Sequence, residues 1–110
     1  MKRFLLLVVV FLLAACGSRA EVGENFDLSV GELATVADAD ILIRVDSIGR
    51  DFTEGGEIPF VVLMVEVDGE EHSSELSVAE DLDLGNYTVE VQSIDPFADP
   101  PECSLRVSAQ

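Results

Sequence analysis

The stretch Val61-Val62-Leu63-Met64-Val65-Glu66-Val67-Asp68-Gly69 decides the fold of this chain. Every second residue from 61 to 67 is aliphatic, and the intervening positions include a glutamate. Successive side chains of a strand point to opposite faces, so this alternation predicts a half-buried β-strand. Asp68-Gly69 directly after it is a strong signal for a two-residue hairpin turn, because both turn residues must accept a positive φ. We therefore expect a second strand to follow, over residues 72–78.

The same period of two recurs along the chain, and no window of helical length shows a cleaner helical stripe. Turn-forming glycines and asparagine separate the candidate strands. Short strands at regular spacing predict an all-β domain over residues 25–110, a small β-sandwich that is immunoglobulin-like or barrel-like, with about seven to eight strands. The remaining candidate strands cover residues 26–30, 33–36, 41–45, 87–91 and 103–107.

The sequence also repeats itself faintly. Leu28-Ser29-Val30-Gly31-Glu32 recurs as Leu76-Ser77-Val78-Ala79-Glu80, and the strand over residues 41–48 recurs over residues 87–94. Two related halves would each cover the apolar side that the other cannot bury alone. Chance similarity between short valine-rich strands is the alternative.

The N-terminus has the layout of a secretory signal. Lys2 and Arg3 precede an apolar run over residues 4–15, which is shorter than the roughly 20 residues that span a bilayer. Leu13-Ala14-Ala15-Cys16 resembles the bacterial lipobox. The resemblance implies a signal peptide over residues 1–15, removed after a diacylglyceryl group is attached to the Cys16 sulfur. The alternative is an ordinary cleaved signal with a chance cysteine.

A lipid-bearing Cys16 places the protein in the cell envelope, anchored to a bilayer by its acyl chains, palmitate included. Residues 16–24, which are polar and without periodicity, are expected to form a tether between this anchor and the domain. Gly17 after the cysteine resembles lipoproteins sent to the outer membrane, if the source has two membranes.

The body of the chain, residues 26–107, resembles a loose family of small exported bacterial domains of unassigned function. The matching motifs are Phe26-Asp27-Leu28-Ser29-Val30-Gly31, then Asn86-Tyr87 after Gly85, then Ile94-Asp95-Pro96, and a final strand from Cys103. Many such domains carry cysteine and tryptophan after the third strand, where this chain has residues 47–52 with neither. The resemblance implies an all-β fold and no activity.

The charge excludes one class of partner. The chain has 22 acidic and six basic residues, a net charge of −16. Nucleic-acid binding rests on clustered lysine and arginine, so a nucleic-acid partner is not expected. Apolar residues make up 48% of the chain, which does not meet the low-hydrophobicity criterion for disorder, so the domain should fold with its carboxylates outward.

No catalytic set is apparent. His72, the one histidine, lies beside Ser73 and Ser74, but alternation allows it to share a face only with Ser74, and no nucleophile elbow is present. We expect a solvated histidine. Cys103 shares its strand face with Leu105 and Val107, which predicts a buried thiol packed as a small hydrophobic residue, with a reactive or intermolecular thiol as the alternative.

The His, Cys and Met residues are too few, and lack the spacing, to form a zinc or blue-copper site. Carboxylate groups could instead offer oxygens to calcium, although none matches an EF-hand loop and acidic residues this numerous cluster by chance. A calcium site is thus a secondary hypothesis, and no other cofactor is expected. The candidate residues are Asp38, Asp40, Glu80, Asp81 and Asp83, with Asp95, Asp99 and Glu102 as a further group.

The sequence therefore predicts a membrane-anchored envelope lipoprotein without enzymatic activity, acting as a structural module or through contacts with an envelope or extracellular protein. Residues 51–59 are expected to form an exposed loop of the kind that can bind partners. Asn86-Tyr87-Thr88 fits a glycosylation sequon, but a turn before a strand is the preferred interpretation. The alternatives are a calcium-binding β-domain and an envelope protein whose acidity is an adaptation to high salt.

Overall fold

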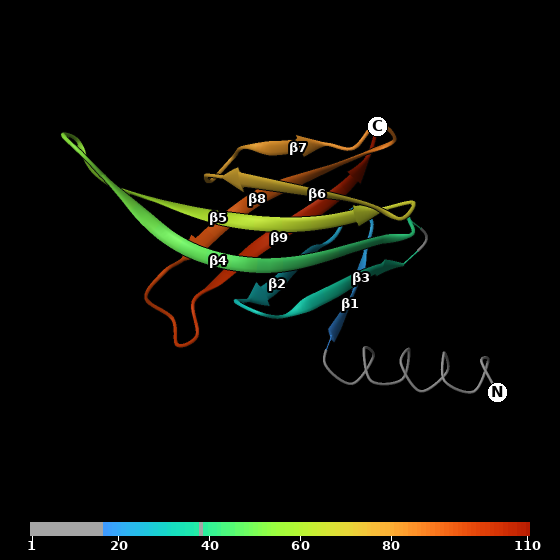
Figure 1. Cartoon of the computed structure of the whole chain (residues 1–110), viewed down its shortest axis with the longest axis horizontal. Helices are drawn as coiled ribbons and strands as arrows, with labels where there is room; N and C mark the ends of the chain where they lie inside the picture. Colours follow the sequence, from blue (N-terminus) through green and yellow to red (C-terminus); the bar gives the residue numbers. More distant parts are fainter. Residues whose placement is uncertain (1–16, 38) are drawn as a thin grey trace.

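The computed structural model describes residues 17–37 and 39–110, so the predicted signal peptide, Cys16 and Asp38 lie outside the described residues. The described residues form nine strands joined by turns and loops, with no helix among them (Figure 1). Consequently, none of them belongs to a helix long and apolar enough to cross a bilayer. The strands are β1 (Gly17–Glu21), β2 (Asn25–Ser29), β3 (Leu33–Ala37), β4 (Ile41–Thr53), β5 (Gly56–Val67), β6 (Glu70–Leu76), β7 (Asp81–Asp83), β8 (Tyr87–Asp95) and β9 (Glu102–Ala109).

The strands form two sheets. Sheet A has the order β1-β3-β4-β5-β6, and sheet B has the order β2-β9-β8-β7. All neighbouring strands are antiparallel except β1, which runs parallel to β3. The prediction of an all-β sandwich is confirmed, and the described residues contain nine strands where about seven to eight were expected.

The core lies between the sheets and includes alternate residues of the segments 41–45, 61–65, 89–91 and 103–107 that the sequence pattern identified. The aliphatic residues at 61, 63 and 65 of β5 are fully buried, as are Val89 and Val91 of β8. No polar or charged residue is buried in the described part of the chain, so the carboxylates do turn outward. Cys103, at 2% exposure, belongs to this core. The full set is Ala20, Leu28, Ala34, Val36, Ile41, Ile43, Val45, Val61, Leu63, Val65, Leu76, Val89, Val91, Cys103, Leu105 and Val107.

The predicted hairpin at Asp68-Gly69 is present. Val67 pairs with Glu70, leaving a two-residue turn between β5 and β6. Asp68 has φ 52° and Gly69 has φ 81°. Positive φ at both positions is what a type I′ turn requires, and aspartate followed by glycine meets that requirement with little strain. This turn fixes the register that sends the aliphatic residues of β5 into the core.

The predicted repeat is visible in the topology. β3, β4 and β5 are consecutive neighbours in sheet A, and the strand next to β5 is β6. In sheet B, β7, β8 and β9 are consecutive neighbours, and the strand next to β9 is β2. The first half comprises β2 to β5, and the second half comprises β6 to β9. Each half therefore contributes three strands to one sheet and its first strand to the other sheet. Neither half can bury its apolar face without the other.

Hydrogen bonds repeat with the strands. The Ser29 N–H donates to the Glu32 carboxylate at 2.7 Å, and the Ser77 N–H donates to the Glu80 carboxylate at the same distance. The Gly31 N–H then donates to the Val45 carbonyl at 2.8 Å, and the Ala79 N–H donates to the Val91 carbonyl at 2.9 Å. The register shifts between residues 45 and 47 in β4 and between residues 91 and 93 in β8, at equivalent places.

Residues 17–21 correct the expectation of a free tether over residues 16–24. They form β1, which pairs with β3 from Gly17 opposite Leu33 to Glu21 opposite Ala37. Ala20 of this strand is buried against the core. An edge strand can be held by main-chain hydrogen bonds and one small apolar contact, so its sequence needs no regular alternation.

Residues 51–59 correct a second expectation. They do not form a loop: β4 continues to Thr53 and β5 begins at Gly56, so the connection is only Glu54-Gly55. The Thr53 hydroxyl donates to the Gly56 carbonyl at 2.9 Å across this turn. The side chains from Arg50 to Ile58 are exposed on both faces of the ribbon, so apolar alternation is absent and the strands are not recognisable from periodicity.

Candidate functional site

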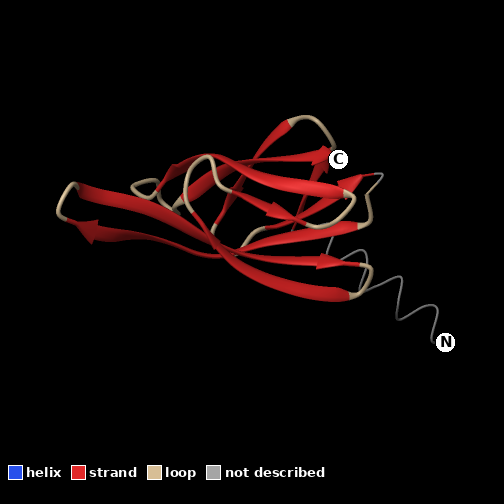
Figure 2. Ribbon diagram, turned by 90° about the horizontal axis from the view of Figure 1, so that it is seen from above, coloured by secondary structure: helices blue, strands red, loops and turns tan. Residues whose placement is uncertain are grey.

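The most distinctive surface is the outer part of the β4–β5 hairpin, residues 49–60, which we call the arm. The pairing of β5 with β6 ends at Val61 opposite Leu76, and the pairing of β3 with β4 ends at Leu33 opposite Arg44. Beyond these points β4 and β5 pair only with each other. The arm projects past the other strands in two perpendicular views (Figures 1 and 2).

The two faces of the arm follow from its register. Gly49 lies opposite Phe60, and Asp51 lies opposite Ile58, which places these four on one face. The other face carries Arg50 opposite Pro59 and Phe52 opposite Glu57. This second face continues the core-facing side of sheet A, since Val61 at the base of the arm is fully buried and pairs with Ile48. We call it the inner face.

The base of the arm is held by a close contact between an aromatic ring and a glycine. A Cβ atom added at Gly49 would lie 2.6 Å from Cζ of Phe60, which real Cβ atoms do not tolerate. The ring therefore covers the Gly49 backbone from the opposite strand. Glycine weakens a strand because it has no side chain to pack. An aromatic ring on the neighbouring strand that packs over the glycine compensates for this effect.

Arg50 connects the arm to sheet B. Its Nη1 donates to Oε2 of Glu57 at 2.8 Å. Its Cζ lies 4.7 Å from the centre of the Phe97 ring and 5.7 Å from that of the Phe52 ring. Both distances are within the range of a cation–π interaction. Phe97 belongs to the β8–β9 loop, whose start is shaped by a hydrogen bond from the Phe97 N–H to the Asp95 carboxylate at 3.1 Å.

Exposed apolar residues gather at this end of the sandwich. Phe52 is 75% exposed and Phe97 is 73% exposed. Ile58 and Val78 are also exposed, and Val78 follows Leu76, the residue that pairs with Val61 at the base of the arm. These four are the large hydrophobic residues that are exposed in the described part of the chain. We call this end, formed by the arm, the β6–β7 turn and the β8–β9 loop, the arm end.

Acidic residues accompany the apolar residues in the arm and at the β8–β9 connection. Six exposed acidic residues lie within residues 49–60 and 95–102, where Arg50 is the one basic residue. An apolar centre with a polar rim is typical of protein-binding surfaces. The acidic residues are Asp51, Glu54, Glu57, Asp95, Asp99 and Glu102.

The calcium candidates do not converge. Within the described ranges, no group of three or more His, Cys, Asp or Glu side chains is arranged to hold a metal ion. Glu80 and Asp83 accept main-chain hydrogen bonds, from the Ser77 N–H and the Gly85 N–H respectively. The Gly85 N–H, followed by the Gln110 amide, lowers the pKa of the Asp83 carboxyl. Asp81 lies opposite Glu90, Asp40 lies at the turn before β4, and Asp38 is outside the described residues.

His72 is exposed on β6, opposite Val65. Ser74 lies opposite Leu63 and so shares the histidine's side of the strand, as the alternation predicted, while Ser73 lies opposite Met64 on the other side. Cys103 is a free thiol in the core, as expected. Burial, followed by the charges of Asp27 and Glu102, raises the pKa of this thiol to about 12. A thiol with such a pKa is unreactive at neutral pH.

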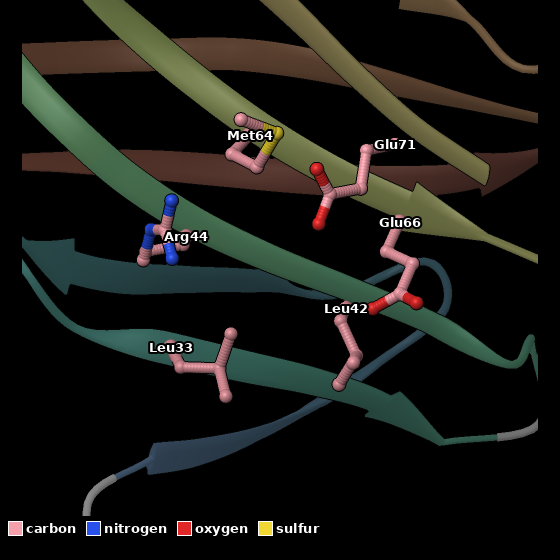
Figure 3. A pocket seen from close by; sticks show the side chains of 6 residues that line it. All are labelled: Leu33, Leu42, Arg44, Met64, Glu66 and Glu71. Atoms are coloured by element: carbon pink, nitrogen blue, oxygen red, sulfur yellow. The ribbon is translucent and has the colours of Figure 1, made fainter. Parts of the chain in front are cut away.

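The outer face of sheet A carries a shallow hollow of about 60 Å³ (Figure 3). Arg44 stands in it beside Met64, and its Nε donates to Oδ1 of Asp46 at 2.9 Å. The volume is far below the 300 Å³ or more of typical small-molecule sites, so the hollow gives no support to a ligand-binding function. Its lining residues are Leu33, Leu42, Arg44, Met64, Glu66 and Glu71.

The sequence does not single out Arg50, Phe52 or Phe97; it predicts an exposed loop over residues 51–59 and offers Asp95, Asp99 and Glu102 only as a further calcium group. Phe52 and Ile58 flank a Gly-Gly pair within an acidic segment, which was the available signal. The proximity of Phe97 to Arg50 joins segments 47 positions apart and has no local sequence pattern.

Comparison with known proteins adds no relative. No protein-family model, no curated protein and no solved structure matches this chain.

Proposed function

We propose that this protein is a lipid-anchored lipoprotein of the cell envelope that has no enzymatic activity and binds another protein through its arm end. The observation that carries the proposal is the exposure of Phe52 and Phe97, whose ring centres lie 5.7 Å and 4.7 Å from Cζ of Arg50, at a protruding hairpin. Monomeric proteins rarely leave large apolar side chains grouped at one place without a partner for them.

The energetics of the arm support a bound state. A two-stranded ribbon is at best marginally stable in water without further packing. Beyond its base, the arm is further stabilised by the contacts of Arg50 with Glu57 and Phe97. Burying one phenylalanine side chain contributes about 1.5–3 kcal/mol, so Phe52 and Phe97 together could supply a substantial part of a binding free energy.

Gly17, the described residue next to the predicted anchor, lies away from the tip of the arm. Gly17, which follows Cys16, lies beside Leu33, and Leu33 lies opposite Arg44 of β4. From Arg44 to Thr53 the strand runs about 30 Å at 3.3 Å per residue. A lipid at Cys16 would thus leave the tip of the arm well separated from the attachment point and accessible to a partner.

Site-specific photocrosslinking tests the binding function. A benzophenone amino acid replaces Phe52 in the full chain, produced in the cell that normally makes it, and the matched control carries the same group at Leu42 on the outer face of sheet A. We expect a discrete adduct with one protein at position 52 that is absent at position 42. Equal labelling at both positions, or none at position 52, would refute binding at the arm end.

Membrane attachment is tested separately. The full chain should incorporate radioactive palmitate and sediment with membranes, and Cys16→Ala should lose both properties. A Cys16→Ala chain that remains membrane-bound would contradict the lipid anchor without bearing on the arm end.

A further inference from the structure

We infer that the arm end binds a protein segment in which an apolar side chain is flanked by lysine or arginine, and that this segment docks on the inner face of the arm against Phe52 and Phe97. The inference rests on the proposed binding function and specifies the chemistry of the partner. It is argued from the register of the arm, from its charge and from the residues that surround the two aromatic rings.

The inner face of the arm continues the core-facing side of sheet A, but sheet B does not extend far enough to cover it. Ile48 and Val61 on this face pack at the edge of the core, and Arg50 and Phe52 follow at the next alternate positions. The facing sheet is shorter: the last pair of β8 and β9 is Asp95 opposite Glu102. Beyond that pair the β8–β9 loop reaches the inner face through Phe97, whose ring lies 4.7 Å from Cζ of Arg50. The inner face therefore presents Phe52 and Pro59 beside the Arg50–Glu57 ion pair, and it lies beyond the last strand pair of the facing sheet.

The flanking charge selects the partner. Residues 49–60 and 95–102 carry six carboxylates and one basic residue, Arg50, and that arginine already pairs with Glu57. A segment bearing cations would gain attraction to the exposed carboxylates of Glu54, Asp95 and Asp99, and its cations could also contact the exposed ring faces. An acidic or uncharged segment would lack both contributions.

Two other occupants are disfavoured by the same charges. A second copy of this chain would bring an equally acidic arm end into contact, which is repulsive. Insertion of Phe52 into a bilayer would carry Glu54, at the tip of the hairpin, and the neighbouring Asp51 toward the hydrocarbon, which is costly for carboxylates.

The test uses the full, isotopically labelled chain anchored in phosphatidylcholine nanodiscs. Three synthetic peptides share a Val-Phe-Val centre and differ only in flanking residues, which are lysine, serine or glutamate. Amide spectra at physiological ionic strength report where each peptide binds and how tightly. We expect saturable shifts confined to residues 49–60 and 95–102, with the lysine peptide binding at least tenfold more tightly than the serine peptide and the glutamate peptide not binding.

A variant with unchanged net charge distinguishes docking of the peptide on the aromatic rings from nonspecific electrostatic attraction. Phe52→Ala combined with Phe97→Ala should weaken the lysine peptide at least tenfold. Leu42→Ala combined with Met64→Ala on the outer face of sheet A is the matched control and should leave binding unchanged. Equal binding by wild type and the Phe52/Phe97 variant would overturn the inference in favour of nonspecific charge attraction.

The remaining outcomes are also decisive. Serine and lysine peptides that bind the arm end equally would overturn the basic partner while leaving the proposed binding function intact. Arm signals broadened by the nanodisc before any peptide is added would assign the surface to lipid, and arm signals that shift with protein concentration would assign it to a second copy. Shifts outside the arm end for all three peptides would overturn the inference and the proposed function together.

Discussion

Cys103 occupies in the second half of the sandwich the position that Val61 occupies in the first. Val61 pairs with Leu76 on one side and Ile48 on the other, and Cys103 pairs with Leu28 and Ile94. Leu28 and Leu76 are themselves equivalent in the repeat, as are Ile48 and Ile94. The thiol is therefore a core residue in a place where the other half uses valine.

This equivalence predicts the effect of replacing the cysteine. Cys103→Val should change the free energy of unfolding by less than about 1.5 kcal/mol, because the site already accepts valine in the other half. Cys103→Ser should destabilise by about 1–3 kcal/mol, because it places a hydroxyl among apolar side chains. Urea unfolding of both variants measures the difference. Equal stabilities would show that position 103 is not part of a tightly packed core.

The thiol should also make stability depend on alkaline pH. Its pKa is about 12 in the folded chain against an ordinary value of 9.0, so the folded state disfavours the thiolate. The resulting contribution is complete below about pH 9 and is lost as the pH rises toward 12. The unfolding free energy of wild type should fall more steeply than that of Cys103→Val over this interval. Parallel curves for the two proteins would contradict the raised pKa.

Glu32 and Glu80 should contribute similarly to stability, because each carboxylate accepts the N–H of the serine three residues before it at 2.7 Å. We expect Glu32→Ala and Glu80→Ala each to lower the unfolding free energy by about 1 kcal/mol. The double variant should show the sum, since the two turns do not share partners. The conservative Glu→Gln changes keep an acceptor oxygen and should cost less. A large effect at one site alone would show that the two turns are not energetically equivalent.

Gly49→Ala should weaken the arm more than the sandwich. The new methyl group would meet the Phe60 ring at 2.6 Å, so the ring must leave its place on the backbone. Hydrogen exchange should accelerate at amides of residues 49–60, while the core strands change little because the arm lies beyond their pairing. Adding Phe60→Ala removes the clash but also the covering ring. If Gly49→Ala left exchange in the arm unaltered, the contact would have no role in holding it.

The sequence predicted the architecture where burial imposes a pattern. Residues 61–67 alternate because one face of β5 lies in the core, and Asp68-Gly69 follows because a two-residue turn needs positive φ. The repeat was visible for the same reason: Leu28 and Leu76 are both buried, and Glu32 and Glu80 both close a turn. These requirements are local, so each one produces a recognisable pattern in residues that are close together in the sequence.

Features that leave no local sequence pattern could be identified only from the tertiary structure. β1 was not foreseen because it is held beside β3 mainly through main-chain pairing, which any sequence can supply. The arm was not foreseen as strands because its residues are exposed on both faces. The meeting of Arg50 with Phe97 depends on how the two halves come together. The sequence by itself thus determined the strands with buried alternate residues, the central turn and the acidic surface. Only the packing of the two sheets brought together the exposed aromatic residues of the arm end, because that proximity is a relation between distant segments.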